Sequence, residues 1–174
     1  MRTLTVIGVS PSGGFGNFLA DNLAIDYEVT RYGRAEPNWK LDSDVVVLNM
    51  FDRDKPLMQM VHLSHLFKEM KDTNKALVAI GSTIHYYNPV QSGYSNGKHA
   101  LHKMFYSLAL NIAEYRCRMI LIEPGALDNK HGQPQLSHHM KQKELVELIR
   151  VALSLNQKFL HIAAQGVHPP MEIT

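Results

Sequence analysis

The chain has 174 residues, which is enough for a sizeable core, and we expect a single domain over residues 1–174. Hydrophobic residues make up 45% of the chain and charged residues 20%. The formal net charge of +2 comes without a long basic run, so the composition gives no reason to expect a nucleic-acid or membrane partner. The one cysteine excludes an internal disulfide, and the N-terminal apolar run is too short for a signal peptide or membrane span, so we expect a cytoplasmic protein.

The N-terminal part of the sequence predicts a strand, a turn, a helix and a second strand. Residues 4–9 form a short β-branched run that is typical of a buried parallel strand. Glycine and serine at 10–14 predict a turn, residues 16–23 carry apolar residues along one side of a helix, and 27–32 predict the next strand.

The rest of the chain continues the alternation of strands and helices. In chain order, the predicted elements are a strand at 44–50, a helix at 56–71, a strand at 76–81, a helix at 91–115, a strand at 119–122, a helix at 141–155 and a strand at 159–163. Such alternation predicts a parallel sheet of about six strands that is covered on both faces. Ligands of such sheets bind beyond the carboxyl ends of the strands.

A glycine-rich turn follows the first predicted strand, and we expect it to bind a dinucleotide. Glycine lets the backbone turn tightly and approach a ligand closely, and the helix after the turn offers free N–H groups to a pyrophosphate. No Gly-Lys-Ser/Thr occurs, so a P-loop for a nucleoside triphosphate is not predicted. The expected contacts are Gly8, Ser10, Ser12, Gly14, Phe15 and Gly16. The alternative is an ordinary glycine-rich connection.

The end of the second predicted strand indicates which dinucleotide is bound. An acidic residue there would hold the ribose of NAD, whereas the chain has Arg31 and Arg34 and no acid between them. A guanidinium suits the 2′-phosphate of NADP, so NADP is favoured, with NAD as the alternative. Either arginine can also be read as a solvated surface charge.

Tyr94 and Lys98 stand four residues apart in the helix predicted at 91–115, and Ser82 follows the strand before it. Residues at this spacing share one helix face, where a lysine cation lowers the pKa of a phenol. The phenol can then exchange a proton with a carbonyl or alcohol oxygen that the serine hydroxyl holds. This chemistry interconverts carbonyls and alcohols with hydride from a nicotinamide. Alone, the spacing occurs by chance in many helices.

Taken together, these residues resemble the short-chain dehydrogenase/reductase family, whose markers occur in the family's order over most of the chain. The first two markers are the glycine turn with Gly8, Gly14 and Gly16, and the Asp44–Phe51 strand, in which Asn49 matches a family asparagine. The other two are the trio Ser82, Tyr94 and Lys98, and the Pro124-Gly125-Ala126-Leu127 segment. The resemblance implies a Rossmann-type doubly wound sheet, NAD(P) as cofactor, and a small-molecule carbonyl or alcohol as substrate.

The resemblance also assigns roles to individual residues. Tyr94 is the implied general acid/base, Lys98 lowers its pKa and binds the nicotinamide ribose, and Ser82 orients the substrate oxygen. The implied cofactor contacts at the next strand ends are Asn49, Met50, Phe51, Pro124, Gly125 and the backbone of Leu127.

The chain departs from the family pattern at several positions. The glycine turn is two residues longer than usual, and Met50 and Phe51 replace a small Ala-Gly pair, which we expect to crowd the adenosine ribose. The helix at 56–71 lacks the asparagine that the family often places there, and Gln59 and His62 are the nearest polar substitutes.

The sequence is also unusually short for the family. Residues 33–43 are too few for the usual third strand and its helix, which we expect to be reduced or absent. Residues 126–140 leave little room for the substrate lid. A reduced lid predicts an open site, with broad specificity or a bulky substrate.

Three functions fit these observations to different degrees. The first is an NADP-preferring oxidoreductase that interconverts a carbonyl and an alcohol. The second is a dinucleotide-binding sensor or partner-binding protein with little or no turnover. The third, nucleotide-sugar chemistry, needs a large substrate domain for which the chain has no room.

Two further expectations concern assembly and metals. The helices at 56–71 and 91–115 have wide apolar sides, and in the family they form a two-fold interface, so we expect a homodimer or tetramer. The ten histidines show no HExxH or paired-cysteine spacing, so no metal site is predicted, and Glu123 has no evident catalytic partner.

Overall fold

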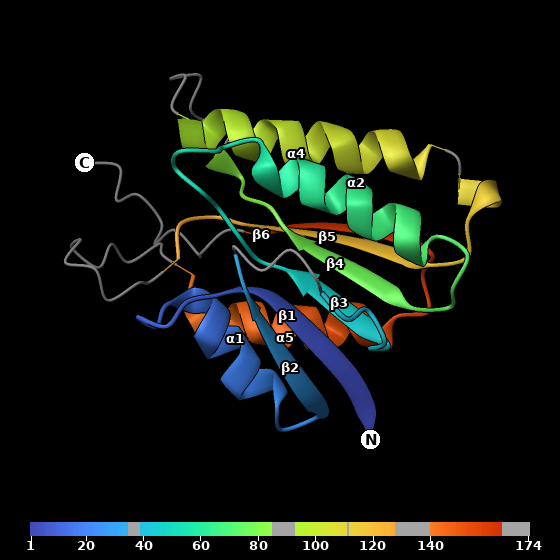
Figure 1. The fold of residues 1–174 in the computed structure, drawn as a ribbon, viewed down its shortest axis with the longest axis horizontal. Helices are drawn as coiled ribbons and strands as arrows, with labels where there is room; N and C mark the ends of the chain where they lie inside the picture. The colour runs from blue at the N-terminus through green and yellow to red at the C-terminus, as the bar shows by residue number, and fades with distance from the viewer. Residues whose placement is uncertain (35–38, 85–92, 111, 128–139, 165–174) are drawn as a thin grey trace, which may run out of the picture.

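The structure, a computed structural model, describes residues 1–34, 39–84, 93–110, 112–127 and 140–164. These residues build a parallel sheet with the strand order β2-β1-β3-β4-β5-β6 (Figure 1). The strands are β1 (Arg2–Val9), β2 (Tyr27–Gly33), β3 (Val45–Leu48), β4 (Ala76–Ile80), β5 (Arg118–Pro124) and β6 (Phe159–Ala164). The helices are α1 (Phe15–Leu23), α2 (Met58–Met70), α4 (Gly93–Ala109) and α5 (Gln142–Ser154), with a 3₁₀ turn, η1 (Ile112–Glu114). The predicted six-stranded, doubly wound sheet is confirmed.

Helices cover both faces of the sheet, α1 and α5 on one and α2 and α4 on the other (Figure 1). β3 shows why, because successive side chains of a strand point to opposite faces and all four of its residues are buried. Val45 and Val47 pack with α1 and α5, whereas Val46 and Leu48 pack with α2 and α4.

The predicted loss of the third family strand is also confirmed. β2 is an edge strand of the described sheet, and the chain from Trp39 returns along the sheet face that α2 and α4 cover. Trp39 meets the ring of His62 edge-on at 4.7 Å, and the Lys75 ammonium donates to the Leu41 carbonyl at 2.5 Å. This short return segment covers apolar surface that a strand and helix would otherwise bury.

The helix predicted at 91–115 is wrong at its C-terminal end. α4 ends at Ala109 because the chain must turn to bring Tyr115 and the β5 strand into place. Tyr115 is buried with its ring 5.2 Å from that of Phe67, and the Arg116 N–H donates to the Lys71 carbonyl at 2.6 Å.

In the described part of the chain, no helix has the length and apolar character to cross a membrane.

Candidate active site

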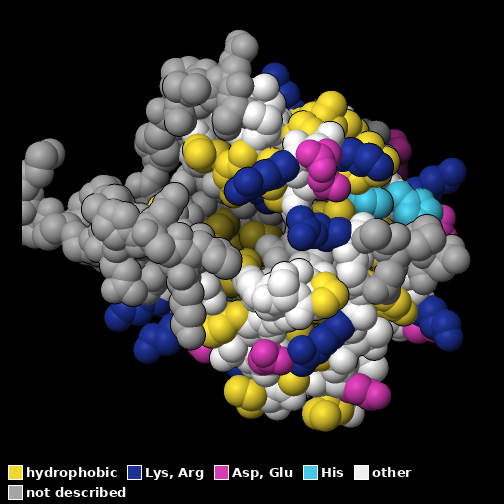
Figure 2. Space-filling model, turned by 60° about the vertical axis from the view of Figure 1, so that its left-hand side comes forward, with side chains coloured by type: hydrophobic (Ala, Val, Ile, Leu, Met, Phe, Trp, Pro, Cys, Tyr) yellow, Lys and Arg dark blue, Asp and Glu magenta, His cyan; other side chains and the backbone are white. Residues whose placement is uncertain are grey.

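The carboxyl ends of the parallel strands bring the predicted site residues to one edge of the sheet. Gly8 lies at the end of β1, Asn49 follows β3, Ser82 follows β4, and Pro124 ends β5. Figure 2 turns the left-hand side of Figure 1 forward and shows hydrophobic side chains recessed at its centre, with Lys and Arg side chains around them. The four strand-end positions thus lie along the same edge of the parallel sheet.

The glycine turn is held by direct backbone contacts that leave no room for side chains. Gly8 has φ +105°, and a Cβ on it would lie 1.6 Å from the Asn49 carbonyl oxygen. A Cβ on Gly16 would lie 2.4 Å from the Gly8 carbonyl oxygen. The ends of β1 and β3 and the start of α1 therefore touch, and only glycine allows this.

The turn also presents an open helix N-terminus. Gly14 precedes α1, and among the described residues no side chain caps the helix and no acid occupies its first turn. Inside the turn, the Ser10 and Ser12 hydroxyls are 2.8 Å apart, and the Asn17 amide donates to the Ser10 carbonyl at 2.8 Å. The N–H groups of the first turn are suited to an anion such as a pyrophosphate.

Ser82 and Tyr94 come together as predicted. Ser82 is buried just beyond β4, and Tyr94 lies in the first turn of α4, near enough for the Ser82 hydroxyl to act on the phenol. Burial raises the pKa of the Tyr94 phenol, and the interaction with Ser82 opposes this effect. The expected lowering of the Tyr94 pKa by Lys98 is therefore corrected, because burial dominates and keeps the phenol protonated.

Lys98 is buried, and its ammonium is held by acceptors of the protein. Its ammonium donates to the Gln59 Oε1 at 2.8 Å and to the Ile80 carbonyl at 2.9 Å, and it lies 5.7 Å from the centre of the Tyr94 ring. Burial lowers the pKa of Lys98 to about 7, and the charge of Glu123 partly offsets this. Gln59, one of the two polar substitutes in α2, thus contacts the lysine directly.

Gly97 has a role that sequence reasoning missed. A Cβ on Gly97 would lie 2.3 Å from the Pro56 carbonyl oxygen, so α4 packs directly on the chain entering α2. Glycine inside a helix costs about 1 kcal/mol relative to alanine. That unfavourable choice between Tyr94 and Lys98 was the one available signal of close packing.

The residues after β3 do not all line the cleft as expected. The Met50 side chain is buried in the core on the α2 and α4 face, which leaves only its backbone for a ligand. Phe51 instead packs edge-on against Tyr94, with ring centres 4.7 Å apart. The expected crowding of an adenosine ribose therefore does not come from the Met50 side chain, and for Phe51 it stays a prediction.

The two candidate arginines differ in their surroundings. Arg31 forms an ion pair with Asp21 of α1 at 2.7 Å. Arg34 lies beyond β2 and donates to the Phe51 carbonyl at 2.7 Å, so it reaches across to the end of β3. Of the two, Arg34 therefore lies at the edge that carries the other site residues.

The Pro124–Leu127 segment is fixed at the end of β5. The Thr83 N–H donates to the Pro124 carbonyl at 3.0 Å, and the Gly125 N–H donates to the Ala164 carbonyl at 2.7 Å. Leu127 packs on the α1 and α5 side of the core and pairs with Met140, which returns the chain to α5. The predicted reduced lid falls mainly on 128–139, outside the described residues.

Comparison of sequences identifies a curated relative. The chain is 26% identical over 140 residues to the peroxisomal 2,4-dienoyl-CoA reductase of Saccharomyces cerevisiae. The match covers 79% of this chain and 41% of the yeast protein, so the chain spans less than half the length of that relative. No family model matches the sequence.

Comparison of structures confirms the fold. 4-Hydroxyisoleucine dehydrogenase in complex with NADH matches with a TM-score of 0.70, 15% identity, and 94% of this chain and 96% of that chain covered. The alcohol dehydrogenase of the archaeon Thermococcus sibiricus, in complex with 5-hydroxy-NADP, matches with a TM-score of 0.67 and 17% identity. The match covers 97% of this chain and 98% of that chain. A short-chain dehydrogenase from Burkholderia cenocepacia, in complex with NADP, matches with a TM-score of 0.67 and 15% identity. The match covers 94% of this chain and 89% of that chain. The chain thus shares the fold of these dehydrogenases, including a short-chain dehydrogenase.

Proposed function

We propose that the protein binds NAD(P) at the carboxyl edge of its sheet and reduces the carbonyl group of a small molecule to an alcohol. The observation that carries the proposal is that Ser82, which follows β4 and acts on the Tyr94 phenol, lies at the same edge of the sheet as the open N-terminus of α1. The glycine contacts of the turn and the absence of a described cap on α1 suit a pyrophosphate. The yeast relative is a reductase, and two of the matched structures hold NADH or NADP, which supports the same cofactor class here.

The site residues divide the work of carbonyl reduction. The nicotinamide, when bound, supplies the hydride. The Tyr94 phenol, kept protonated by burial, donates its proton to the carbonyl oxygen, while the Ser82 hydroxyl holds that oxygen in place. A tyrosine with a raised pKa is protonated at neutral pH and therefore has the proton that carbonyl reduction needs.

Lys98 supports this site from inside the protein. Its two hydrogen bonds join α4 to Gln59 of α2 and to the end of β4. Its ammonium, whose pKa burial lowers to about 7, is held in place by these two acceptors. We propose that Lys98 positions Tyr94 through α4.

The direct test of the proposed function is a fluorescence titration with NADPH and NADH followed by turnover on a panel of aldehydes and ketones. We expect saturable binding of a reduced cofactor and substrate-dependent oxidation of it. Failure of both cofactors to bind would overturn the proposal.

Replacing Arg34 by alanine is expected to weaken NADPH binding by about 10- to 150-fold and NADH binding by less than about twofold. The reason is that a guanidinium at the end of β2 contributes about 1.5–3 kcal/mol to a phosphate contact that NADH lacks. Arg31→Ala is the matched control, because Arg31 already pairs with Asp21. Equal weakening of both cofactors by Arg34→Ala would show that Arg34 supports Phe51 and not a 2′-phosphate.

A second candidate function is dinucleotide binding with little turnover. Two observations favour it, namely the inward orientation of Lys98 and the packing of Phe51 against the Tyr94 ring. Such a protein would bind NADPH tightly, and removal of the Tyr94 hydroxyl would leave its slow NADPH oxidation unchanged.

We also propose a homodimer formed through α2 and α4. Val61 of α2 is 50% exposed and Leu110, just after α4, is 80% exposed, so both present apolar surface to solvent. Val61→Glu is expected to convert the dimer to a monomer in size-exclusion chromatography with light scattering. Val151→Glu on α5, an equally exposed valine on the opposite face, is the control and should stay dimeric. Identical masses for both variants would contradict this interface.

A further inference from the structure

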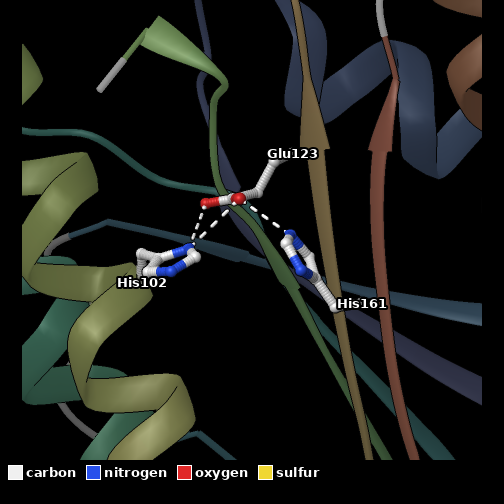
Figure 3. Close-up of side chains that lie close together, drawn as sticks. All are labelled: His102, Glu123 and His161. Carbon is white, nitrogen blue, oxygen red and sulfur yellow. Dashed lines mark hydrogen bonds and ion pairs between the residues drawn. The ribbon is translucent and has the colours of Figure 1, made fainter. Parts of the chain in front are cut away.

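Three polar side chains from distant parts of the sequence meet beside the sheet. His102 of α4, Glu123 of β5 and His161 of β6 point toward one another (Figure 3). The His102 Nδ1 lies 3.1 and 3.2 Å from the two Glu123 carboxylate oxygens, and the His161 Nε2 lies 2.8 Å from Oε2. Glu123, which the sequence left without an evident catalytic partner, is therefore held between two imidazoles.

The packing around Glu123 makes room for this arrangement. Glu123 is fully buried, and an isolated buried carboxylate is strongly disfavoured unless a cation or several donors accompany it. A Cβ on Gly81 would lie 2.8 Å from the Glu123 Cγ and 2.9 Å from Oε1, so glycine at position 81 opens the space that the side chain occupies. The cluster is thus built into the junction of β4, β5 and α4.

We propose that His102, Glu123 and His161 form a binding site for a divalent transition-metal ion of the zinc class. Two imidazoles and one carboxylate suit Zn²⁺, and three protein ligands leave a fourth position for water. The ligand atoms all lie within 4.8 Å of one another, and a tetrahedral ion would set them about 3.3 Å apart. Binding of an ion would therefore draw the most widely separated of these ligand atoms closer together.

Tyr106 supports the site from one turn further along α4. Its hydroxyl lies 2.7 Å from the His161 Nδ1, the ring nitrogen that faces away from Glu123. With a metal on Nε2, the proton moves to Nδ1 and is donated to the Tyr106 oxygen, which fixes the ring orientation as outer hydrogen bonds do in metal sites. The imidazoles of His102 and His161 are 19% and 17% exposed, so an ion can reach the buried carboxylate.

The test is a titration of the chelator-treated full chain with Zn²⁺ by calorimetry, and with Co²⁺ by visible absorption. We expect one ion per chain in the wild type and a cobalt spectrum typical of tetrahedral nitrogen and oxygen ligands. His102→Gln and His161→Gln should each weaken Zn²⁺ binding at least about 100-fold, and Tyr106→Phe about tenfold. Glu123→Gln can unfold the protein, so the histidine variants carry the test, with circular dichroism and thermal melting as checks of folding.

Two controls separate this site from the other histidines. His65→Gln changes an exposed histidine of α2, and the double variant His138→Gln/His139→Gln changes an adjacent pair outside the described residues. Both are expected to bind Zn²⁺ like the wild type. Absence of binding in the wild type, or unchanged binding in folded His102→Gln and His161→Gln, would overturn the proposal. Because the readout is metal binding, its outcome is independent of whether the chain reduces carbonyls.

Discussion

Replacing Tyr94 by phenylalanine is expected to lower kcat for carbonyl reduction by about 10²–10⁴-fold, with little change in NADPH affinity. The phenol is the proton donor of the proposed reaction, and a positioned acid contributes a rate factor of this size. The ring that packs against Phe51 is retained in the variant, so the cleft keeps its shape. The loss should therefore appear in kcat and not in the dissociation constant of NADPH.

The measurement is steady-state oxidation of NADPH with the best carbonyl of the panel, together with fluorescence titration of the cofactor. Tyr27→Phe is a matched control, because Tyr27 lies at the amino end of β2 and the candidate site lies at the carboxyl ends of the strands. If the wild type and Tyr94→Phe oxidise NADPH at the same slow rate while both bind it tightly, the protein is a dinucleotide-binding module without this chemistry.

The raised pKa of Tyr94 also fixes the direction of the pH dependence. Carbonyl reduction needs the protonated phenol, so its rate should hold through neutral pH and fall only as the pH rises through a pKa above the ordinary value of about 10. Alcohol oxidation needs the phenolate and should rise with pH over the same range. The Tyr94→Phe variant should lose both limbs. A reduction rate that falls between pH 6 and 8 would point to another group, such as Lys98 with its pKa of about 7.

The sequence predicted those features that depend on local patterns. The β-branched run of β3, the glycine turn, the placement of Ser82 at a strand end and that of Tyr94 in the next helix follow from periodicity and from the geometry of parallel sheets. The predicted end of α4 is wrong because Tyr115 is drawn into the core by packing against Phe67, which overrides helical spacing.

Side-chain orientation and long-range contacts could not be predicted in this way. Lys98 stands at the expected spacing from Tyr94, yet its ammonium turns inward because Gln59 and the Ile80 carbonyl accept its hydrogen bonds. His102, Glu123 and His161 share no local spacing, since three separate elements bring them together. These contacts arise from tertiary packing, which local sequence patterns do not predict.

Gly8→Ala is expected to destabilise the protein by more than about 4 kcal/mol, which is a large part of the 5–15 kcal/mol that typically holds a domain folded. Two effects add in this variant. The φ of +105° is unfavourable for any residue with a Cβ, at about 1–2 kcal/mol, and the new methyl group would overlap the Asn49 carbonyl oxygen at 1.6 Å. To relieve that overlap, the end of β1 must move away from the end of β3. This movement would displace the glycine turn that follows β1.

Gly13→Ala separates the two effects, because Gly13 also has a positive φ, +89°, but no described atom lies within 4 Å of the place that a methyl group would take. We expect Gly13→Ala to lose only the conformational part, about 1–2 kcal/mol, and to keep NADPH binding. Urea denaturation followed by circular dichroism measures both variants, and the shift of the midpoint gives the difference between them. Equal midpoints for Gly8→Ala and Gly13→Ala would mean that β1 and β3 are not in backbone contact at Asn49. The close approach of Gly8 to Asn49 would then not explain why glycine stands at position 8.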